Sequence, residues 1–492
     1  MTTAPELDRP TVPSDLTTDL LVAGTWTSGG AGILPTLNPA TGEVLAEVAA
    51  ADTDDVDRAV AAAEEAFRTT WAAVPPHERA ALLHRLADLV ERDAQHLATL
   101  EALDVGSSFG FAQMLFVPNL VRSLRYYAGW ADKLEGQLVP ADAFMGRPVH
   151  AYTKREPLGV VAAIVPWNSP LMILGWKLAP ALATGNVVIV KPSEEAPLSC
   201  LHVVRLAAEA GFPAGTVQVL PGAGAVVGEA LSLHAGVQKV SFTGSTPVGR
   251  RIAQNATHTF KRTTLELGGK SAQLVFADAD VERTVPGIAM GLFANQGESC
   301  AIGSRVLVHR SLHDQVVEGL REAQRAQVVG DPFDPSTTVG PLISARHRDR
   351  VMGYVESGRT EGATLVAGGA AVDRPGFFVE PTVFAGDHDL TIAREEIFGP
   401  VGVVIPFDDE DDAIRLANST EYGLAATVWT GDVTRAHSVA DRLRAGAVAV
   451  NGWSPLAPQL PWGGVGASGV GRELGVEGIL ENTETKTVTV VL

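Results

Sequence analysis

Cysteine is almost absent from this sequence: 492 residues contain two, Cys200 and Cys300. Two thiols cannot build a disulfide framework, which excludes the small secreted scaffolds that depend on one. The 12 histidines form no HExxH or HxH pattern and the cysteines form no CxxC pair. A catalytic zinc or iron would therefore need ligands scattered along the chain, and we expect no bound metal.

Positive charge is also scarce, with 38 Lys and Arg residues against 57 Asp and Glu residues and a net charge of −19. This charge repels phosphate backbones and anionic lipids, so we expect no nucleic-acid partner and no membrane partner. No apolar run approaches the length of a membrane span, and residues 1–20 carry acids and prolines where a signal peptide has a basic start. We therefore expect a soluble, cytoplasmic protein.

Hydrophobic residues, by contrast, make up 46% of the chain. That fraction is enough for more than one core, and the length exceeds what one core usually supports, so we expect at least two domains. Residues 52–67 begin with acidic cap candidates and repeat apolar residues at Val56, Ala59, Ala63 and Phe67. This spacing predicts an amphipathic surface helix.

Short runs rich in Val and Ile alternate with helical stretches from residue 158 onward. The first series is LGVVAAIVP (158–166), NVVIVKP (186–192), GTVQVLPG (215–222) and VQKVSFTGS (237–245). The second series is SRVLVH (304–309), VGVVIPF (401–407), AATVWTG (425–431) and GAVAVNGW (446–453). Such runs predict parallel strands covered on both faces, so the fold class is α/β with two sheets. The alternating TKTVTVVL (485–492) predicts a strand half-buried against another surface, such as a second subunit.

The glycine fingerprint of ordinary dinucleotide-binding folds, GxGxxG, is missing. GAGAVVG (222–228) has Val227 at the place of the third glycine, and a flexible turn is the simpler interpretation. SFTGSTPVG (241–249) is better placed because it follows a predicted strand. Gly244 and Ser245 would begin a helix whose free amides can face a diphosphate.

Charged residues at two predicted strand ends are candidates for chemistry. Lys191 and Glu194 emerge where open α/β sheets bind ligands, although a solvated ion pair is the alternative interpretation. Glu266 stands in the apolar LELGGKS (265–271), where burial would raise its pKa and suit a general base. A salt-bridged structural glutamate is the alternative there.

Cys300 lies in NQGESCA (295–301) between small residues, and Glu266 is 34 positions upstream. A nucleophilic thiol needs a lowered pKa or a base, and the alternative is a small buried hydrophobe. Cys200 belongs to a regular amphipathic helical pattern and fits the second interpretation.

HRDR (347–350) copies three letters of a protein-kinase catalytic loop. The Gly-rich loop, the DFG motif and the Lys-bearing strand of kinases do not accompany it. A solvated helix face is the expectation for this segment.

Seven motifs in one order carry a resemblance that none of them carries alone. They are PWN (166–168), KPSE (191–194), FTGS (242–245), ELGGK (266–270), GESC (297–300), EEIFGP (395–400) and GGVGASGVGRE (463–473). Together they closely resemble the aldehyde dehydrogenase superfamily, and the likeness runs from about Leu21 to the C-terminus. The resemblance implies a Rossmann-variant cofactor domain without the usual glycines, a second α/β catalytic domain and a small β oligomerisation arm. It places the NAD-binding domain at 1–134 and 154–267, the catalytic domain at 268–464, and the bridging segments at 135–153 and 465–492.

The resemblance also implies roles for individual residues. Cys300 matches the nucleophile, Asn168 an oxyanion-hole donor, Glu266 the general base and Glu473 a second carboxylate in a proton path. The residues that match cofactor-binding positions are Trp167, Lys191, Glu194, Gly244, Ser245, Glu396 and Phe398. We expect NAD to be favoured over NADP, because the Glu194 carboxylate would repel a 2′-phosphate.

A set of mostly apolar positions matches the substrate funnel of the family. It comprises Asn119, Ser169, Met172, Trp176, Ala294, Ser299, Ala301, Leu456 and Trp462. Small residues at Ser169 and Ala294 and the lack of Arg or Lys favour a medium or bulky apolar or aromatic aldehyde. An aminoaldehyde or betaine aldehyde is the alternative, as is a catalytically silent structural or binding relative. Glu266 argues against an acyl-CoA-forming enzyme, because a base there would hydrolyse the thioester.

Glu298 departs from the pattern, because many members of the family have Gln two residues before the nucleophile. An inward-pointing carboxylate would disfavour a thiolate on Cys300. We expect the Glu298 side chain to point away. The tail at 485–492 resembles the family strand that pairs across subunits, so we expect a homodimer or homotetramer.

Overall fold

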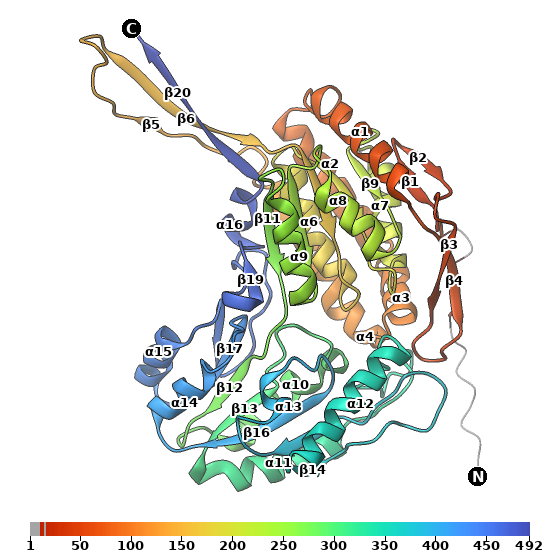
Figure 1. The fold of residues 1–492 in the computed structure, drawn as a ribbon, viewed down its shortest axis with the longest axis vertical. Helices are drawn as coiled ribbons and strands as arrows, with labels where there is room; N and C mark the ends of the chain where they lie inside the picture. The colour runs from red at the N-terminus through yellow and green to blue at the C-terminus, as the bar shows by residue number, and fades with distance from the viewer. Residues whose placement is uncertain (1–9, 14–15) are drawn as a thin grey trace.

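The computed structural model describes residues 10–13 and 16–492, which form two helix-covered sheets and a projecting arm (Figure 1). The expectation for residues 1–20 falls partly on residues 1–9 and 14–15, which lie outside the described ones. Within the described ranges, every helix is too short or too polar to cross a bilayer.

The first sheet has eight strands in the order β19-β11-β10-β7-β8-β9-β1-β2. Its strands are β1 (Leu20–Val22), β2 (Thr25–Thr27), β7 (Val160–Ile164), β8 (Val187–Lys191), β9 (Val217–Val219), β10 (Lys239–Thr243), β11 (Arg262–Glu266) and β19 (Gly469–Val470). The central five, from β11 to β9, are parallel, and every residue of β7, β8 and β10 is buried. The prediction of fully covered parallel strands is therefore confirmed for this sheet.

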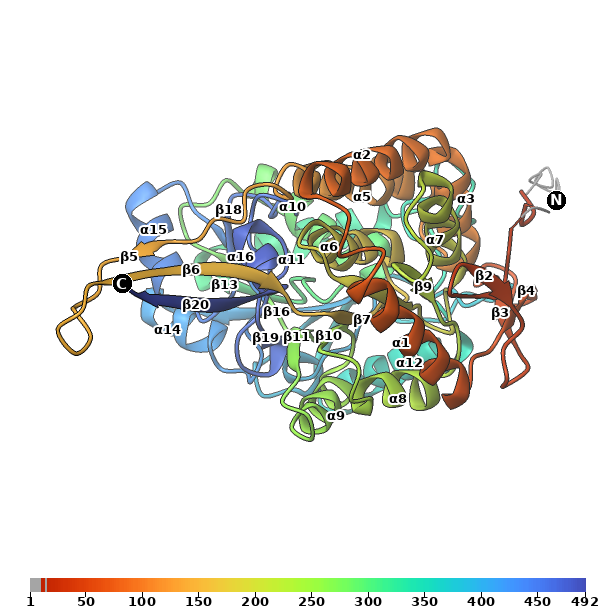
Figure 2. The ribbon, with the colours of Figure 1, turned by 90° about the horizontal axis from the view of Figure 1, so that it is seen from above.

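Helices between residues 53 and 256 surround this sheet and cover both of its faces (Figures 1 and 2). They are α1 (Thr53–Arg68), α2 (Pro76–Arg92), α3 (Ala94–Asp104), α4 (Phe109–Phe111), α5 (Val117–Ala128), α6 (Pro170–Ala183), α7 (Leu198–Ala210), α8 (Glu229–Leu233) and α9 (Thr246–Ala256). The helix predicted at 52–67 is α1, and the Asp52 side chain caps it by accepting the N–H of Asp55. Every residue of α6 is buried, so this helix forms the centre of the first core. Cys200 is fully buried in α7, as the sequence predicted.

The second sheet has seven strands in the order β14-β15-β16-β13-β12-β17-β18, and all neighbours except β14 and β15 pair in parallel. Its strands are β12 (Ala272–Val275), β13 (Arg305–His309), β14 (Thr364–Ala367), β15 (Thr382–Ala385), β16 (Val401–Phe407), β17 (Ala425–Trp429) and β18 (Ala447–Val450). Its helices are α10 (Val281–Phe293), α11 (His313–Arg325), α12 (Ala345–Thr360), α13 (Thr391–Arg394), α14 (Glu410–Ala417) and α15 (Val433–Arg442). The predicted division between residues 267 and 268 falls between β11 and β12, which belong to different sheets. The domain boundaries themselves stay a prediction.

Two smaller β units complete the chain. A hairpin is formed by β3 (Ile33–Leu37) and β4 (Val44–Ala49), and the arm by β5 (Leu138–Val139), β6 (Val149–Pro157) and β20 (Thr483–Val491), which follows α16 (Gly475–Leu480). Strand β20 pairs with β6 along its whole length, from Thr483 opposite Pro157 to Val491 opposite Val149. The arm extends away from both sheets, and most of β20 is exposed (Figures 1 and 2).

Candidate active site

Four parallel strands of the first sheet end at one edge, because β7, β8, β10 and β11 run in the same direction and in register. Ile164 pairs with Lys191 and Phe242, and Thr243 pairs with Glu266. The residues that follow these strands therefore meet, which is why the PWN, KPSE, FTGS and ELGGK motifs come together from separate parts of the chain.

Cys300 reaches this edge from the second sheet, on a loop between α10 and β13. Three successive residues, Asn295, Gln296 and Gly297, have positive φ angles of 49°, 56° and 69°. Left-handed conformations are costly for residues with side chains and persist when the surroundings hold them. A side chain at Gly297 would also meet the backbone of Gly399, with a Cβ 2.3 Å from its carbonyl carbon. The loop is thus bent sharply and packed tightly around the cysteine.

A cavity of about 590 Å³ lies where the sheet edge and this loop meet. Most of the residues that the sequence predicted for the site line it: Trp167, Asn168, Ser169, Met172, Trp176, Gly244, Ser245, Glu266, Ser299, Cys300, Ala301, Glu396, Phe398, Leu456 and Trp462. The volume matches that of small-molecule sites, and the walls combine apolar side chains with a few polar groups.

Two residues predicted for the substrate wall do not line this cavity. Asn119 is fully buried, accepts the indole N–H of Trp176 at 2.8 Å and donates to the carbonyl of Leu456 at 2.7 Å. Asn119 therefore holds these two wall residues from behind. Its buried amide needs hydrogen-bond partners for its polar atoms, and Trp176 and Leu456 supply them. Ala294 ends α10 and is also absent from the lining.

Glu473 lies behind Glu266 in a buried polar cluster. Its Oε1 accepts hydrogen bonds from Lys177 Nζ at 2.6 Å and from Ser241 Oγ at 3.0 Å. Both carboxylate oxygens of Glu266 lack a hydrogen-bond partner in the structure, and so does Oε2 of Glu473. Burial raises the pKa of Glu266 well above its usual range and the charge of Glu473 raises it further, while Lys177 and Arg472 oppose the shift.

The thiol of Cys300 is protonated in this environment. Burial raises its pKa to about 12, and the carboxylates of Glu266 and Glu396 contribute to the increase. Beside it, the side-chain amide of Asn168 donates to the carbonyl oxygen of Glu298 at 2.9 Å. This bond uses one of the two amide protons, so the second is available to a group in the cavity.

The residues assigned to a dinucleotide form a second part of the site. Lys191 is buried and pairs with Glu194 at 2.9 Å, and Glu194 Oε1 accepts the N–H of Gly224 at 3.1 Å. Helix α9 begins after Ser245, whose side chain makes no capping hydrogen bond. The N–H groups of Thr246 and Val248 in the first turn are therefore open to an anionic group such as a diphosphate, while Pro247 between them has no N–H, and these residues fit a dinucleotide. Lys191 and Glu194 do not line the large cavity.

The segment HRDR was predicted to be a solvated helix face. Arg350 is exposed as expected, but the His347 side chain is largely withdrawn from solvent, so the expectation is wrong for His347. His347 and Arg350 line the cavity from α12. The ring of His347 stands edge-on to Trp167 and its Nε2 donates to the carbonyl of Phe398 at 2.7 Å, while Arg350 donates to the carbonyl of Ile397. The charge pattern of HRDR gave no signal for this role, because the role depends on which face of α12 meets the EEIFGP segment.

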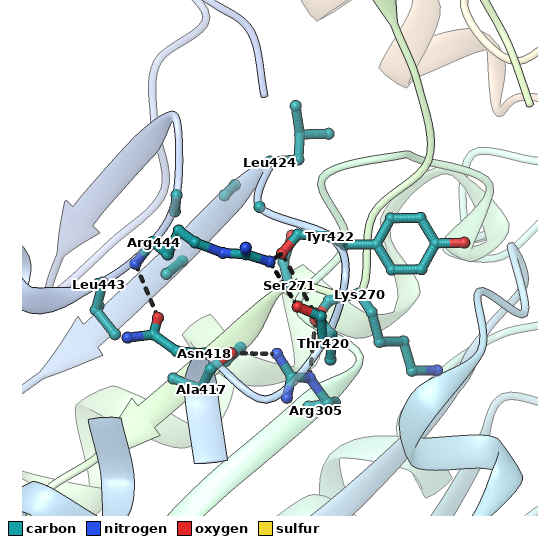
Figure 3. Close-up of a pocket in the computed structure, with 15 residues that line it drawn as sticks. Lys270, Ser271, Arg305, Ala417, Asn418, Thr420, Tyr422, Leu424, Leu443 and Arg444 are labelled. Carbon is teal, nitrogen blue, oxygen red and sulfur yellow. Dashed lines mark hydrogen bonds between the residues drawn. The ribbon is translucent and has the colours of Figure 1, made fainter. Parts of the chain in front are cut away.

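A second, small cavity lies next to the segment that carries Tyr422, and the Tyr422 residue lines both cavities. Its volume of about 20 Å³ has room for one water molecule. Arg305 donates to the carbonyl of Ala417, and the backbone N–H of Arg444 donates to Asn418 Oδ1 (Figure 3). These bonds hold the segment in place, while the Tyr422 side chain points away from them (Figure 3).

Comparisons with known proteins agree with this geometry. The sequence profile of the aldehyde dehydrogenase family matches residues 26–488. Retinal dehydrogenase 2 of Gallus gallus is 44% identical over 478 residues, which cover 96% of this chain and 92% of that protein. Among solved structures, the NAD⁺ complex of an aldehyde dehydrogenase from Bacillus cereus has a TM-score of 0.94 and 43% identity, with 96% of each chain covered. The P. syringae indole-3-acetaldehyde dehydrogenase in complex with NAD⁺ and IAA has a TM-score of 0.94 and 41% identity, with 97% of each chain covered. The chain therefore belongs to the aldehyde dehydrogenase family of NAD(P)-dependent oxidoreductases.

Proposed function

We propose that this enzyme oxidises a medium-sized or bulky apolar or aromatic aldehyde to the carboxylic acid, with NAD, through a covalent intermediate on Cys300. The observation that carries the proposal is that Cys300, Asn168 and Glu266 line one cavity from three separate segments. A nucleophile, an amide donor and a base with unoccupied oxygens are the three groups that acyl transfer requires.

In the first step the sulfur of Cys300 attacks the aldehyde carbon and forms a thiohemiacetal. The free amide proton of Asn168 and the backbone N–H of Cys300 are the donors for the developing oxyanion. Loss of one such donor typically lowers the rate by about 10²–10³. Because the thiol pKa is about 12, its proton must move to a base as the sulfur attacks.

In the last step Glu266 removes a proton from water, the water oxygen bonds to the thioester carbon and the C–S bond breaks. Glu266 then gives this proton to the departing sulfur, so the acid leaves and Cys300 regains a thiol. The buried cluster behind Glu266 supports transfer away from the cavity of the proton that the thiol lost in the first step, since Glu473 has an unoccupied oxygen and contacts Lys177 and Ser241. Glu266 can take the proton only when it is ionised. Because its pKa is raised, its ionised fraction and the rate of this step increase as the pH rises.

NAD, when bound, supplies the hydride acceptor that turns the thiohemiacetal into a thioester. We propose that Lys191 and Glu194 hold its adenosine ribose and that the first amides of α9 face its diphosphate. Trp167, Glu396 and Phe398 would hold the nicotinamide end. The carboxylate of Glu194 would stand close to a 2′-phosphate, which supports a preference for NAD, although Lys191 partly offsets the repulsion.

The wall of the cavity supports the substrate class. Met172, Leu456 and two tryptophans are apolar, and the rings of Trp176 and Trp462 lie 6.2 Å apart between centroids. Ser169 is small and leaves the channel wide. The names of two relatives, a retinal dehydrogenase and an indole-3-acetaldehyde dehydrogenase, point to bulky aldehydes in those proteins.

The arm supports a homodimer or homotetramer. Large apolar side chains at its tip and end, including Phe144, Met145 and Leu492, are exposed in the single chain. Exposed apolar groups on a projecting strand unit mark a surface for a second copy.

Sedimentation of the full chain at micromolar concentration tests this proposal, and a monomer would contradict it. Removal of residues 480–492 should then give monomer or aggregate.

We predict that Cys300→Ala abolishes both dehydrogenase and ester-hydrolysing activity while the cofactor still binds, because no other thiol lines the cavity. Cys200→Ala is the matched control: it removes the other thiol of the chain and should leave turnover almost unchanged. Initial rates at 340 nm and cofactor titration by tryptophan fluorescence measure the two effects. Residual turnover of Cys300→Ala above about a hundredth of wild type would contradict the nucleophile assignment.

Glu266→Gln should slow deacylation, so that acyl-enzyme accumulates and is seen by intact mass. Gln keeps the size of the side chain and cannot take a proton. In the wild type, the rate of this step should rise as the pH rises through the raised pKa of Glu266, and the variant should lose that dependence. Wild-type rates for the variant between pH 6 and 9 would remove Glu266 from the mechanism.

Cofactor preference should depend on Glu194. We predict a higher kcat/KM with NAD than with NADP, and a smaller ratio between the two in Glu194→Gln, because Gln cannot repel a 2′-phosphate. Steady-state kinetics with both cofactors and one aldehyde measure the ratio. A higher kcat/KM with NADP in the wild type would overturn the preference.

Substrate class is tested by comparing kcat/KM for acetaldehyde, hexanal, benzaldehyde, succinic semialdehyde and betaine aldehyde. We predict that hexanal or benzaldehyde leads, because Met172, Leu456 and the two tryptophans offer apolar area. Arg350, a cation elsewhere on the cavity lining, donates to the carbonyls of Ile397 and Glu396. Ser169→Phe should narrow the channel and lower kcat/KM for benzaldehyde more than for acetaldehyde. A tenfold lead for succinic semialdehyde or betaine aldehyde would show that the apolar substrate class is wrong.

A further inference from the structure

Glu298 is a fully buried carboxyl group two residues before the nucleophile, and it lies outside the cavity lining. Its Oε1 accepts the backbone N–H of Ile343 at 3.0 Å, and its Oε2 accepts the side-chain amide of Gln296 at 3.4 Å. The side chain therefore faces the 340–343 segment, which agrees with the expectation that it points away from Cys300.

Among residues 10–13 and 16–492, no cation neutralises this carboxyl. Within the part of the chain that the structure describes, His347 is the titratable side chain within ion-pair distance, with Nε2 at 3.6 Å from Glu298 Oε1. That nitrogen donates its proton to the carbonyl of Phe398, and burial lowers the pKa of His347 to about 4, so the ring is neutral at physiological pH. Burial also raises the pKa of Glu298 well above its usual range.

Other charged groups nearby are engaged elsewhere. On α12, Arg346 pairs with Glu195, and Arg350 donates to backbone carbonyls of the EEIFGP segment. The carboxylates that raise the pKa of Cys300 are Glu266 and Glu396. The 340–343 segment, GPLI, contains no titratable side chain.

The backbone of Glu298 has a separate task in the site. Its carbonyl accepts the side-chain amide of Asn168 at 2.9 Å, and its N–H donates to the carbonyl of Asn295 at 2.9 Å. The three residues before it are left-handed, so the loop relaxes unless something holds it. A side chain anchored on Ile343 holds both the loop and the carbonyl that orients Asn168.

We propose that Glu298 is a positioning residue that acts as an uncharged carboxylic acid, anchoring the nucleophile loop to Ile343 so that Cys300 and the Asn168 amide face the substrate together. The catalytic part of this inference rests on the proposed function; the anchoring itself does not. An uncharged carboxyl resembles an amide in shape and hydrogen bonding, whereas a buried carboxylate without a cation would destabilise the loop.

Thermal unfolding of the full chain across pH 5–9 tests the uncharged state. In the unfolded chain Glu298 ionises near its ordinary pKa, whereas in the native chain it keeps its proton, so native stability falls as the pH rises. Glu298→Gln has no proton to lose. Its unfolding midpoint should therefore rise relative to wild type with increasing pH, by about 1–2 °C per pH unit.

The matched control is Glu65→Gln, which removes an exposed carboxylate from α1 and should shift the midpoint equally at every pH. A constant difference between Glu298→Gln and wild type across this range would show that Glu298 is ionised in the native state, and would overturn the proposal. This measurement needs no substrate, so it stands even if no aldehyde is turned over.

Turnover tests the positioning role. Glu298→Ala should lower kcat by tenfold or more and slow the alkylation of Cys300 by iodoacetamide, with a smaller change in KM for NAD. Glu298→Gln should restore most of both losses, because Gln can accept the Ile343 N–H. If Glu298→Ala has the same kcat and the same rate of Cys300 alkylation as wild type, the Glu298 side chain does not position the loop. Equal losses in Ala and Gln variants would show that the hydrogen bond to Ile343 is not what positions the loop.

Discussion

The chemistry of this protein depends on the desolvation of carboxyl groups where its two sheets meet. Glu266 and Glu298 are buried there and Glu396 is half-buried, and desolvation raises the pKa of each. Loss of water disfavours the ionised form of each group, and neighbouring charges and hydrogen bonds set how far each pKa moves. A carboxyl near Cys300 is therefore ready to exchange a proton, whereas Glu298, anchored away from the cavity, keeps its proton.

The active site depends on close contact between two parts that are built separately. Parallel strands bring Asn168 and Glu266 to one edge of the first sheet, and the loop after α10 brings Cys300 from the second. The two parts touch at a pair of glycines. A Cβ on Gly269 would lie 2.3 Å from the carbonyl oxygen of Cys300, and a Cβ on Gly268 would lie 2.3 Å from the carboxyl group of Glu396. The glycine pair of ELGGK therefore lets two segments touch where any side chain would separate them.

Much of this arrangement follows from local pattern. Val- and Ile-rich runs predicted the buried parallel strands, and parallel strands imply that the KPSE, FTGS and ELGGK ends share an edge. The apolar setting of Glu266 predicted a buried carboxyl with a raised pKa. Other features had no local signal. Asn119 was placed in the substrate wall by resemblance, yet its amide is turned to Trp176 and Leu456, and HRDR was assigned to solvent although His347 packs against Trp167.

The sequence by itself determined the α/β class, the alternation of strands and helices, and the identity and order of the groups at the cavity, because each depends on residue type and spacing within short segments. Only the tertiary structure decided which groups are charged, which side chains form the wall and which stand behind it. Those properties depend on desolvation and on hydrogen bonds between distant segments, such as Glu298 with Ile343 and Lys177 with Glu473, and no local pattern encodes the partner.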